Sequence, residues 1–219
     1  MTLKHQHPLT LIIAGPNSCG KSTIVIRFFE CRDQLRDIVF KNIVCCHSEN
    51  DAPHHLKNVS FVKGAPEFEN PENVPTLIVL DDLMDSAYST KVSELFTKDS
   101  HHRNISLVLI TQNVFHQIPS SRDISLNSKY IVLFKNPRDR TQIVHLAQQV
   151  YPENISSFHK TYLEACKEPQ SYLFLDLTKS INDLLRFRAK IFPGKMFEVF
   201  APVQGNVPIT VTSTICSRP

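Results

Sequence analysis

The chain has 219 residues, enough for one α/β domain with a sizeable core and hardly enough for two. Its 42% hydrophobic and 21% charged residues are typical of a globular protein, so the composition argues against a disordered chain. The net charge of +3 permits a nucleic-acid partner, but it is much weaker than the basic excess of a protein that coats DNA.

Short apolar runs alternate with helical or polar segments, a pattern typical of a mainly parallel sheet covered on both faces. The runs are residues 9–15, 37–46, 76–82, 105–112 and 129–136. Between and after them we expect helices over residues 22–36, 86–100, 139–151 and 155–168. Residues 171–177 and 184–192 predict a terminal strand pair, and residues 193–219 predict a tail or arm that docks on a partner.

The first apolar run leads into Gly15, four further residues and then Gly20-Lys21-Ser22, the spacing of a phosphate-binding loop. Glycines let such a loop turn its N–H groups toward phosphate oxygens, and the following helix presents its positive end to the same anion. We expect Lys21 to reach the β- and γ-phosphates and Ser22 to ligate Mg²⁺. The nucleotide-binding residues predicted here are Gly15, Pro16, Asn17, Ser18, Cys19, Gly20, Lys21, Ser22 and Thr23.

The run TLIVLDD places two carboxylates at the end of a buried strand. Ligands bind in open α/β sheets at the carboxyl ends of the strands, so we expect Asp81 to hold Mg²⁺ through water. Asp82 then stands where a general base can polarise the attacking water. The alternative is that Asp82 caps the next helix.

The run ISLVLITQN ends in amide side chains. Gln112 is predicted to act as a sensor of the γ-phosphate or the lytic water, with Asn113 as a weaker candidate. The alternative is an amide that satisfies the turn between the strand and the next helix.

Two absent motifs narrow the class of nucleotide-binding protein. No N-K-x-D sequence follows for guanine recognition, and no LSGGQ-like sequence marks a transporter ATPase. With the five apolar runs numbered in chain order, we expect the additional-strand ATPase order 5-1-4-3-2, in which one strand separates the phosphate loop from the acidic pair. ATP is therefore favoured over GTP as the nucleotide. We expect a single P-loop ATPase domain over residues 1–192, followed by the arm over residues 193–219.

The six cysteines include no C-x-x-C pair, and Cys19 lies within the phosphate loop. This predicts a reduced intracellular compartment. Cys45-Cys46-His47 lacks a second cluster at ligand spacing, which favours a buried strand end over a metal site. The polar N-terminus and the short first apolar run predict neither a signal peptide nor a membrane segment.

AGPNSCGKST, LIVLDDLM, LVLITQNVFHQ, LNSKYIVLFKNPRDRTQI and SYLFLDL together resemble the genome-packaging ATPases of the FtsK/HerA superfamily. The resemblance is to the poxvirus-like branch found in Polinton/Maverick elements, adintoviruses and virophages, and it covers residues 8–192. The phosphate loop alone is generic, whereas the combination of the acidic pair, TQN and NSKYIVLFKNPRD is more specific.

The resemblance implies a ring-forming, ATP-driven motor that threads double-stranded viral DNA into a preformed capsid, with the capsid or its portal as partner. It implies roles for Lys21, Ser22, Asp81, Asp82 and Gln112. The second acid is often glutamate in the superfamily, so the shorter Asp82 needs a closer water or slower catalysis. The implied location is an infected host cell, in the nucleus or a cytoplasmic virus factory, or on the virion.

A ring motor also needs an arginine finger from the neighbouring subunit. Arg103, Arg122, Arg138 and Arg140 lie in or near suitable loops. Arg122 is preferred because its segment, HQIPSSRDISLNSKY, is expected to be a loop that faces a neighbour; the alternative is a solvated surface residue. Lys91, Lys98 and Arg103, with His101 and His102, form a candidate DNA-contacting patch or a solvated face.

Two other functions remain open from the sequence. A small-molecule kinase would need an arginine-rich lid and an acceptor pocket, and no lid-like arginine cluster is evident. A scaffold that only binds nucleotide predicts no turnover.

Overall fold

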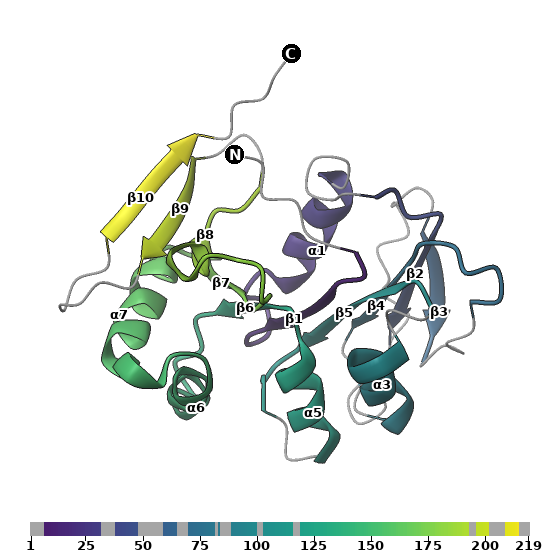
Figure 1. Cartoon of the computed structure of the whole chain (residues 1–219), viewed down its shortest axis with the longest axis horizontal. Helices are drawn as coiled ribbons and strands as arrows, with labels where there is room; N and C mark the ends of the chain where they lie inside the picture. Colours follow the sequence, from purple (N-terminus) through teal and green to yellow (C-terminus); the bar gives the residue numbers. More distant parts are fainter. Residues whose placement is uncertain are drawn as a thin grey trace.

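The computed structural model describes residues 7–31, 38–47, 59–64, 70–81, 83, 89–99, 103–115, 119–192, 196–201 and 209–214. Within these ranges the strands form one sheet with helices on both faces (Figure 1). The strands are β1 (Thr10–Ala14), β2 (Asn42–His47), β3 (Ser60–Lys63), β4 (Thr76–Asp81), β5 (Ile105–Thr111), β6 (Tyr130–Phe134), β7 (Tyr172–Asp176), β8 (Phe187–Ala189), β9 (Met196–Ala201) and β10 (Ile209–Thr214). The α-helices are α1 (Lys21–Glu30), α3 (Thr90–Glu94), α5 (Pro119–Asn127), α6 (Thr141–Val150) and α7 (Ile155–Ala165).

The parallel half of the sheet has the order β6-β1-β5-β4-β2-β3. The first five of these strands are the five predicted apolar runs in the order 5-1-4-3-2, so the additional-strand arrangement is confirmed. β5 separates β1 from β4, and its register with β1 runs from Thr10 opposite Leu107 to Ala14 opposite Thr111. β3 is an additional parallel edge strand that the sequence pattern did not predict.

The antiparallel half continues the sheet beyond β6 in the order β7, β8, β9 and β10. β7 and β8 are the predicted terminal strand pair. β9 and β10 lie in the segment predicted to be a tail or arm, where they form an antiparallel pair and β9 joins β8. The described part of this segment is therefore a continuation of the same sheet, and its docking on a partner stays a prediction.

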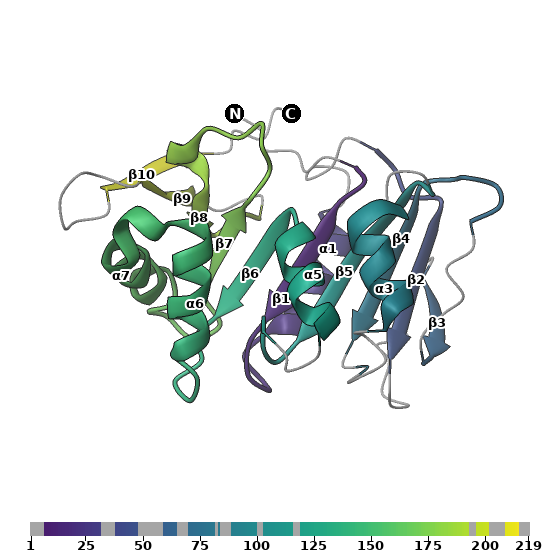
Figure 2. The same cartoon turned by 60° about the horizontal axis from the view of Figure 1, so that its bottom comes forward.

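Two hydrophobic clusters occupy the two faces of the sheet. Along β1, Leu11 and Ile13 belong to the cluster under α1, whereas Ile12 and Ala14 belong to the cluster under α3, α5, α6 and α7. This alternation follows from the two-residue period of a strand. Among the helices that the structure describes, Figures 1 and 2 show α1 on one face and α3, α5, α6 and α7 on the opposite face.

The helices differ from the predicted ones in their bounds. α1 ends at Glu30, and residues 32–37 of the predicted helix lie outside the described residues. α3 begins after the N-cap Ser89, whose hydroxyl accepts from the Val92 N–H, and continues as a π-helical turn, η2 (Leu95–Asp99). None of the helices in the described ranges combines the length and hydropathy needed to span a membrane.

α5 was not predicted, because its segment was expected to be a loop. The buried positions of α5 and of the residue directly after it are Ser121, Ile124, Ser125 and Ser128, which have the i, i+3, i+4, i+7 spacing of one helix face. Ser128 follows the helix and donates from its hydroxyl to the Ile124 carbonyl at 2.7 Å. The face is helical in period, but serines replace most of the apolar residues that reveal such a face in a sequence.

A buried ion pair joins β7 and β8 on the face of the sheet that carries α1. Arg188 is 1% exposed, and its Nη2 donates to Oδ2 of Asp176 at 2.7 Å. The guanidinium lies 5.6 Å from the centroid of the Phe174 ring. Burial lowers the pKa of Arg188, and the neighbouring Asp176 carboxylate opposes that shift.

Candidate nucleotide site

The candidate site lies at the edge of the sheet where the parallel strands end. Because β6, β1, β5, β4 and β2 are parallel, their carboxyl ends meet at the same edge. The phosphate loop follows β1, the sensor segment follows β5, and Asp81 ends β4. Three predicted functional segments therefore come from adjacent strands in the order β1-β5-β4.

The phosphate loop connects β1 to α1 in the strand–loop–helix context that its motif requires. The Gly15 N–H donates to the Thr111 carbonyl at 3.2 Å, which ties the start of the loop to β5. Ser18 has a φ of 60° and Gly20 a φ of 109°, so the loop enters the left-handed region twice. Such turns direct consecutive N–H groups to one side and form an anion-binding concavity.

The two loop glycines lack a side chain for different reasons. A Cβ atom at position 15 would lie 2.6 Å from Cβ of Phe134 and 2.8 Å from Sγ of Cys19. At position 20 a Cβ atom would lie 3.4 Å from Cβ of Gln170, an ordinary contact, but the positive φ strains any L-residue there. Position 15 is thus limited by space and position 20 by backbone conformation.

Lys21 begins α1 and its ammonium turns back over the loop. Nζ donates to the Gly15 carbonyl at 2.8 Å and to the Pro16 carbonyl at 2.9 Å. Ser22 and Thr23 follow in the first turn of α1 with exposed side chains. The ammonium, the loop N–H groups and the positive end of the helix concentrate positive charge at one point, which suits a polyphosphate.

Asp81 is the last residue of β4 and lies opposite Ile110 of β5 and His47 of β2. It is half-buried at the carboxyl edge, as the sequence predicted. Asp82 lies outside the described residues, so its predicted position beside the lytic water stays a prediction. In the described ranges no group of three His, Cys, Asp or Glu residues could hold a metal. A hydroxyl and one carboxylate suit Mg²⁺, which is commonly bound through few protein ligands, with waters and substrate phosphates.

Gln112 directly follows β5 and its side chain is exposed. The residue before it, Thr111, lies opposite Ala14 at the end of β1. The segment after β5 is held by a residue that the sequence did not indicate: Gln142 of α6 accepts from the Val114 N–H at 3.1 Å through Oε1. α6 therefore positions the segment that carries Gln112 and Asn113.

The loop after β6 lies beside the phosphate loop and is also held by an unpredicted residue, Tyr162 of α7. Its hydroxyl accepts from the Asn136 N–H at 2.9 Å and donates to the Phe134 carbonyl at 3.0 Å. Burial raises the pKa of Tyr162 to about 12, so the hydroxyl stays protonated and can donate. Tyr162 contacts the loop after β6, and Gln170 lies against Gly20 of the phosphate loop. Neither residue belongs to a sequence motif, because only the packing of α7 and β7 brings them there.

The candidate arginines fall in three places. Arg122 is exposed on α5, so the expectation that it lies in a loop is wrong; its segment is helical for the packing reason given above. Arg138 and Arg140 are exposed in the loop after β6, at the same edge as the phosphate loop. Arg103 precedes β5 and lies at the opposite edge of the sheet.

The candidate DNA-contacting patch is only partly described. Lys91 of α3 and Arg103 are exposed, whereas the side chain of Lys98 and residues His101 and His102 lie outside the described part.

Two of the buried cysteines are consecutive residues of β2. Cys45 and Cys46 are buried in β2, and burial raises the pKa of each thiol to about 12. The burial of both side chains within β2 fits the interpretation of this pair as a buried strand end.

Sheet order, phosphate loop and acid-bearing strand define the P-loop NTPase fold of the additional-strand type. No protein-family model matches the sequence, and a comparison with curated proteins gives no match. Solved structures do match. The genome packaging NTPase B204 of Sulfolobus turreted icosahedral virus 2, in complex with sulfate, is similar with a TM-score of 0.56 at 13% identity over 78% of this chain and 93% of that chain.

Two further B204 structures agree with this likeness. The complex with AMPPCP has a TM-score of 0.55 at 13% identity and covers 78% of this chain and 93% of that chain. B204, the DNA-packaging ATPase from Sulfolobus turreted icosahedral virus, has a TM-score of 0.54 at 13% identity over 83% of this chain and 96% of that chain. At this identity the likeness shows a shared fold.

Proposed function

We propose that the chain is an ATP-driven motor that moves double-stranded viral DNA into a preformed capsid. The observation that carries the proposal is the adjacency β1-β5-β4, which gathers the phosphate loop, Gln112 and Asp81 at one edge of the sheet. The likeness to B204, a DNA-packaging ATPase, supports the proposal that the energy of ATP hydrolysis is used to move DNA. The finer assignment to the poxvirus-like branch of Polinton/Maverick elements, adintoviruses and virophages rests on the sequence motifs.

In the proposed reaction, water attacks the γ-phosphorus of ATP. The bond between the γ-phosphorus and the bridging oxygen breaks, and ADP leaves with its electron pair. Lys21 leaves the carbonyls of Gly15 and Pro16 and neutralises the β- and γ-phosphate oxygens, while loop residues Gly15–Thr23 hold the phosphate chain. Asp82 takes the proton of the water, and Gln112 orients that water. Ser22 and Asp81 would hold Mg²⁺, which would supply positive charge against the negative charge that develops in the reaction.

We further propose that the active form is a homo-oligomeric ring in an infected cell, with an arginine supplied by the neighbouring subunit. Arg122 remains the first candidate, since it is exposed on α5. Arg138 and Arg140 are on the subunit's own phosphate-loop edge, which suits a role within the subunit. Contacts with DNA and with the capsid or portal belong to the same proposal.

The test is ATP hydrolysis by the purified chain with and without linear double-stranded DNA. DNA-stimulated hydrolysis is expected, and Lys21→Ala and Asp82→Asn should abolish it. Lys179→Ala, an exposed lysine in the turn after β7, is the matched control and should leave the rate unchanged. A hydrolysis rate that DNA does not change, at protein concentrations where rings form, would contradict the motor. Nucleotide binding without turnover would indicate a scaffold.

The trans arginine has its own test. Arg122→Ala subunits mixed with Lys21→Ala subunits should regain part of the activity, because a wild-type finger then meets a wild-type phosphate loop in some interfaces. Absence of rescue, in mixed rings shown to form, would remove Arg122 from this role.

A further inference from the structure

The loop after β6 and the start of α6 share a polar sequence, KNPRDRTQI, over residues 135–143. Side chains of this sequence hold the loop in place. Oδ1 of the buried Asn136 accepts from the Arg138 N–H at 3.1 Å. Oδ1 of Asp139 accepts from the Gln142 N–H at 3.3 Å, near the positive end of α6. The loop is thus tied to the first turn of α6.

The side-chain amide of Gln142 connects two segments that follow different strands. Gln142 is 7% exposed, and its Oε1 accepts from the Val114 N–H at 3.1 Å, in the segment after β5. Its Nε2 donates to the Asp139 carbonyl at 3.5 Å, in the loop after β6. Because β1 lies between β5 and β6, Gln142 joins the segments on the two sides of the strand that leads into the phosphate loop.

The segment after β5 is held at both ends. At its start, the Thr111 hydroxyl donates to the Asn113 carbonyl at 3.1 Å and accepts from the Asn113 N–H at 3.4 Å. At its end, Val114 is 3% exposed, so water is a poor substitute for Gln142 as the acceptor for its N–H. The exposed Gln112 lies between these two fixed points.

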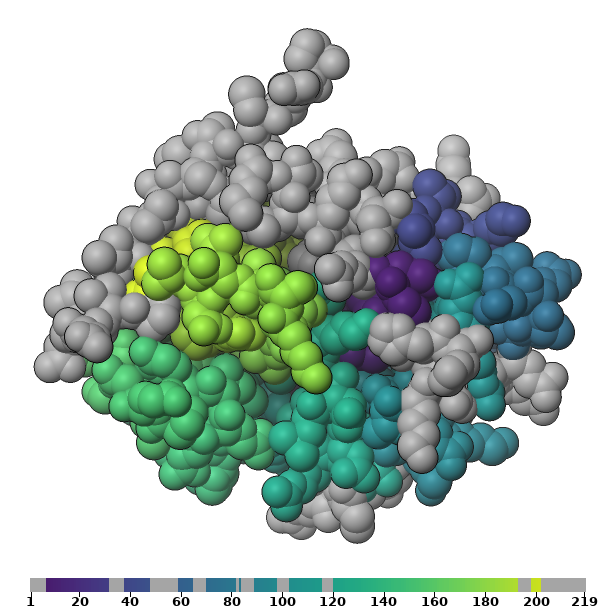
Figure 3. All heavy atoms as spheres, viewed as in Figure 1, coloured from purple at the N-terminus to yellow at the C-terminus, as the bar shows by residue number. Residues whose placement is uncertain are grey.

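α6 is a firm support for this contact. Its residues Ile143, Leu146 and Ala147 are buried in the hydrophobic cluster on this face of the sheet. Figures 1 and 2 show α6 between α5 and α7, and in the space-filling view the surface of residues 141–165 lies beside that of α5 (Figure 3). Core packing therefore fixes α6, and the position of Gln142 follows from it.

We propose that Gln142 is a positioning residue for ATP hydrolysis, which holds the segment after β5 so that Gln112 can orient the lytic water. This inference rests on the proposed function. The phosphate loop has its own tie to β5, since the Gly15 N–H donates to the Thr111 carbonyl at 3.2 Å. Loss of the contact between Gln142 and Val114 should therefore slow turnover much more than it weakens nucleotide binding.

Gln142→Met tests this role, because it removes the acceptor for the Val114 N–H and keeps the length of the side chain. The kcat for ATP hydrolysis should fall about ten- to hundredfold, since a misplacement of about 1 Å near the reacting atoms can have an effect of this size. The Kd of a fluorescent ATP analogue should stay within about twofold of the wild-type value, as expected when ground-state binding is kept. Gln142→Glu retains an oxygen that can accept from the Val114 N–H, so its kcat should stay within about threefold of the wild-type value.

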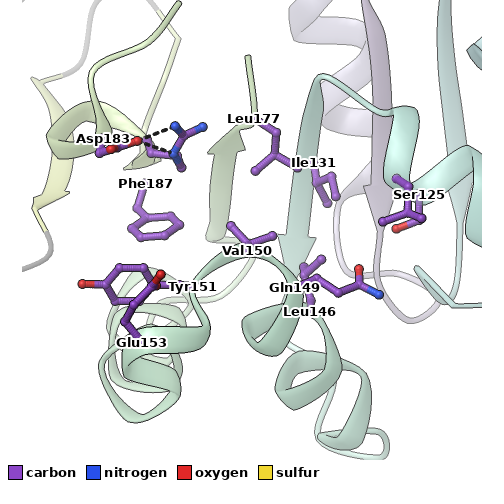
Figure 4. A pocket seen from close by; sticks show the side chains of 12 residues that line it. Ser125, Ile131, Leu146, Gln149, Val150, Tyr151, Glu153, Leu177, Asp183 and Phe187 are labelled. Atoms are coloured by element: carbon purple, nitrogen blue, oxygen red, sulfur yellow. Dashed lines mark hydrogen bonds and ion pairs between the residues drawn. The ribbon is translucent and has the colours of Figure 1, made fainter. Parts of the chain in front are cut away.

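Gln149 provides a matched control, because it is an exposed amide two helical turns further along α6. Its side chain lines a cavity of about 460 Å³ that has Ser125 on one side and Phe187 on the other (Figure 4). The wall of this cavity includes Ile131 near the start of β6, so the cavity lies toward the edge opposite the phosphate loop. Gln149→Met should leave kcat unchanged.

Amide hydrogen exchange at Val114 tests the contact without any turnover. In the nucleotide-free full chain this amide should exchange at least about tenfold more slowly in the wild type than in Gln142→Met. Equal exchange rates in the two chains would overturn the inference, because the hydrogen bond from the Val114 N–H would then not protect this amide.

The kinetic outcomes separate this inference from the proposed function. Wild-type kcat in Gln142→Met would overturn the positioning role, and so would a loss of kcat in Gln142→Glu as large as that in Gln142→Met. A loss of nucleotide affinity that matches the loss of kcat would also overturn it, because it would indicate general structural support. If the wild-type chain hydrolyses no ATP, the proposed function fails and the positioning role fails with it.

Discussion

Gly15→Ala is the substitution that tests the geometry of the phosphate loop most directly. The added methyl group would lie 2.6 Å from Cβ of Phe134 and 2.8 Å from Sγ of Cys19. Cβ of Phe134 is fixed by the backbone of β6, so the loop itself must move. Overpacking of this kind costs about 1–3 kcal/mol of stability, and the displaced loop should lose its alignment with phosphate.

Two other glycines provide controls for this prediction. Gly64 has a φ of 83° and no atom within 4 Å of an added Cβ, so Gly64→Ala isolates the backbone cost of about 1–2 kcal/mol without overlap. Gly20→Ala combines a φ of 109° with ordinary contacts and should have a similar backbone cost within the loop. Only Gly15→Ala tests steric overlap alone.

The assay is urea unfolding together with titration of a fluorescent ATP analogue. Gly15→Ala should lower both stability and affinity, whereas Gly64→Ala should lower stability alone. In the double variant Gly15→Ala/Cys19→Ala the sulfur contact is gone but the Phe134 contact remains, so recovery should be partial. A Gly15→Ala chain with wild-type stability and affinity would refute the packing argument.

Three other outcomes follow from the buried polar groups. Tyr162→Phe leaves the Asn136 N–H without its acceptor and should cost about 1–3 kcal/mol in urea unfolding, with weaker nucleotide binding; an unchanged midpoint would contradict a structural role for this hydroxyl. Arg188→Leu leaves the Asp176 carboxylate buried and unpaired, and should cost about 3–5 kcal/mol; a loss below about 1 kcal/mol would show that water reaches the carboxylate. Burial raises the pKa of the Cys166 thiol from 9.0 to about 12, so this group favours the folded state below pH 9, and its contribution is lost as the pH rises toward 12. Urea unfolding should show a lower free energy of unfolding at pH 10 than at pH 8. A smaller difference in Cys166→Ala would assign this pH dependence to the Cys166 thiol.

Most of the parallel sheet was predictable because its signals are local. Each apolar run is a strand buried on both faces, and parallel connections place all their carboxyl ends at one edge. That reasoning predicted the position of Asp81 across β5 from the phosphate loop and the position of Gln112 beside it. β3 was missed because it is a short edge strand with largely exposed side chains, and α5 because serines form most of its buried face.

The sequence by itself determined the phosphate loop, the order of five parallel strands and the edge at which chemistry is expected, because these follow from local motifs and from strands read along the chain. The tertiary structure decided what surrounds that loop: Phe134 against Gly15, Gln170 against Gly20, and Tyr162 under the loop after β6. It also placed Arg103 at the opposite edge and assembled the cavity from segments as distant as Ser125 and Phe187. These contacts join residues far apart in the chain, and only packing brings them together.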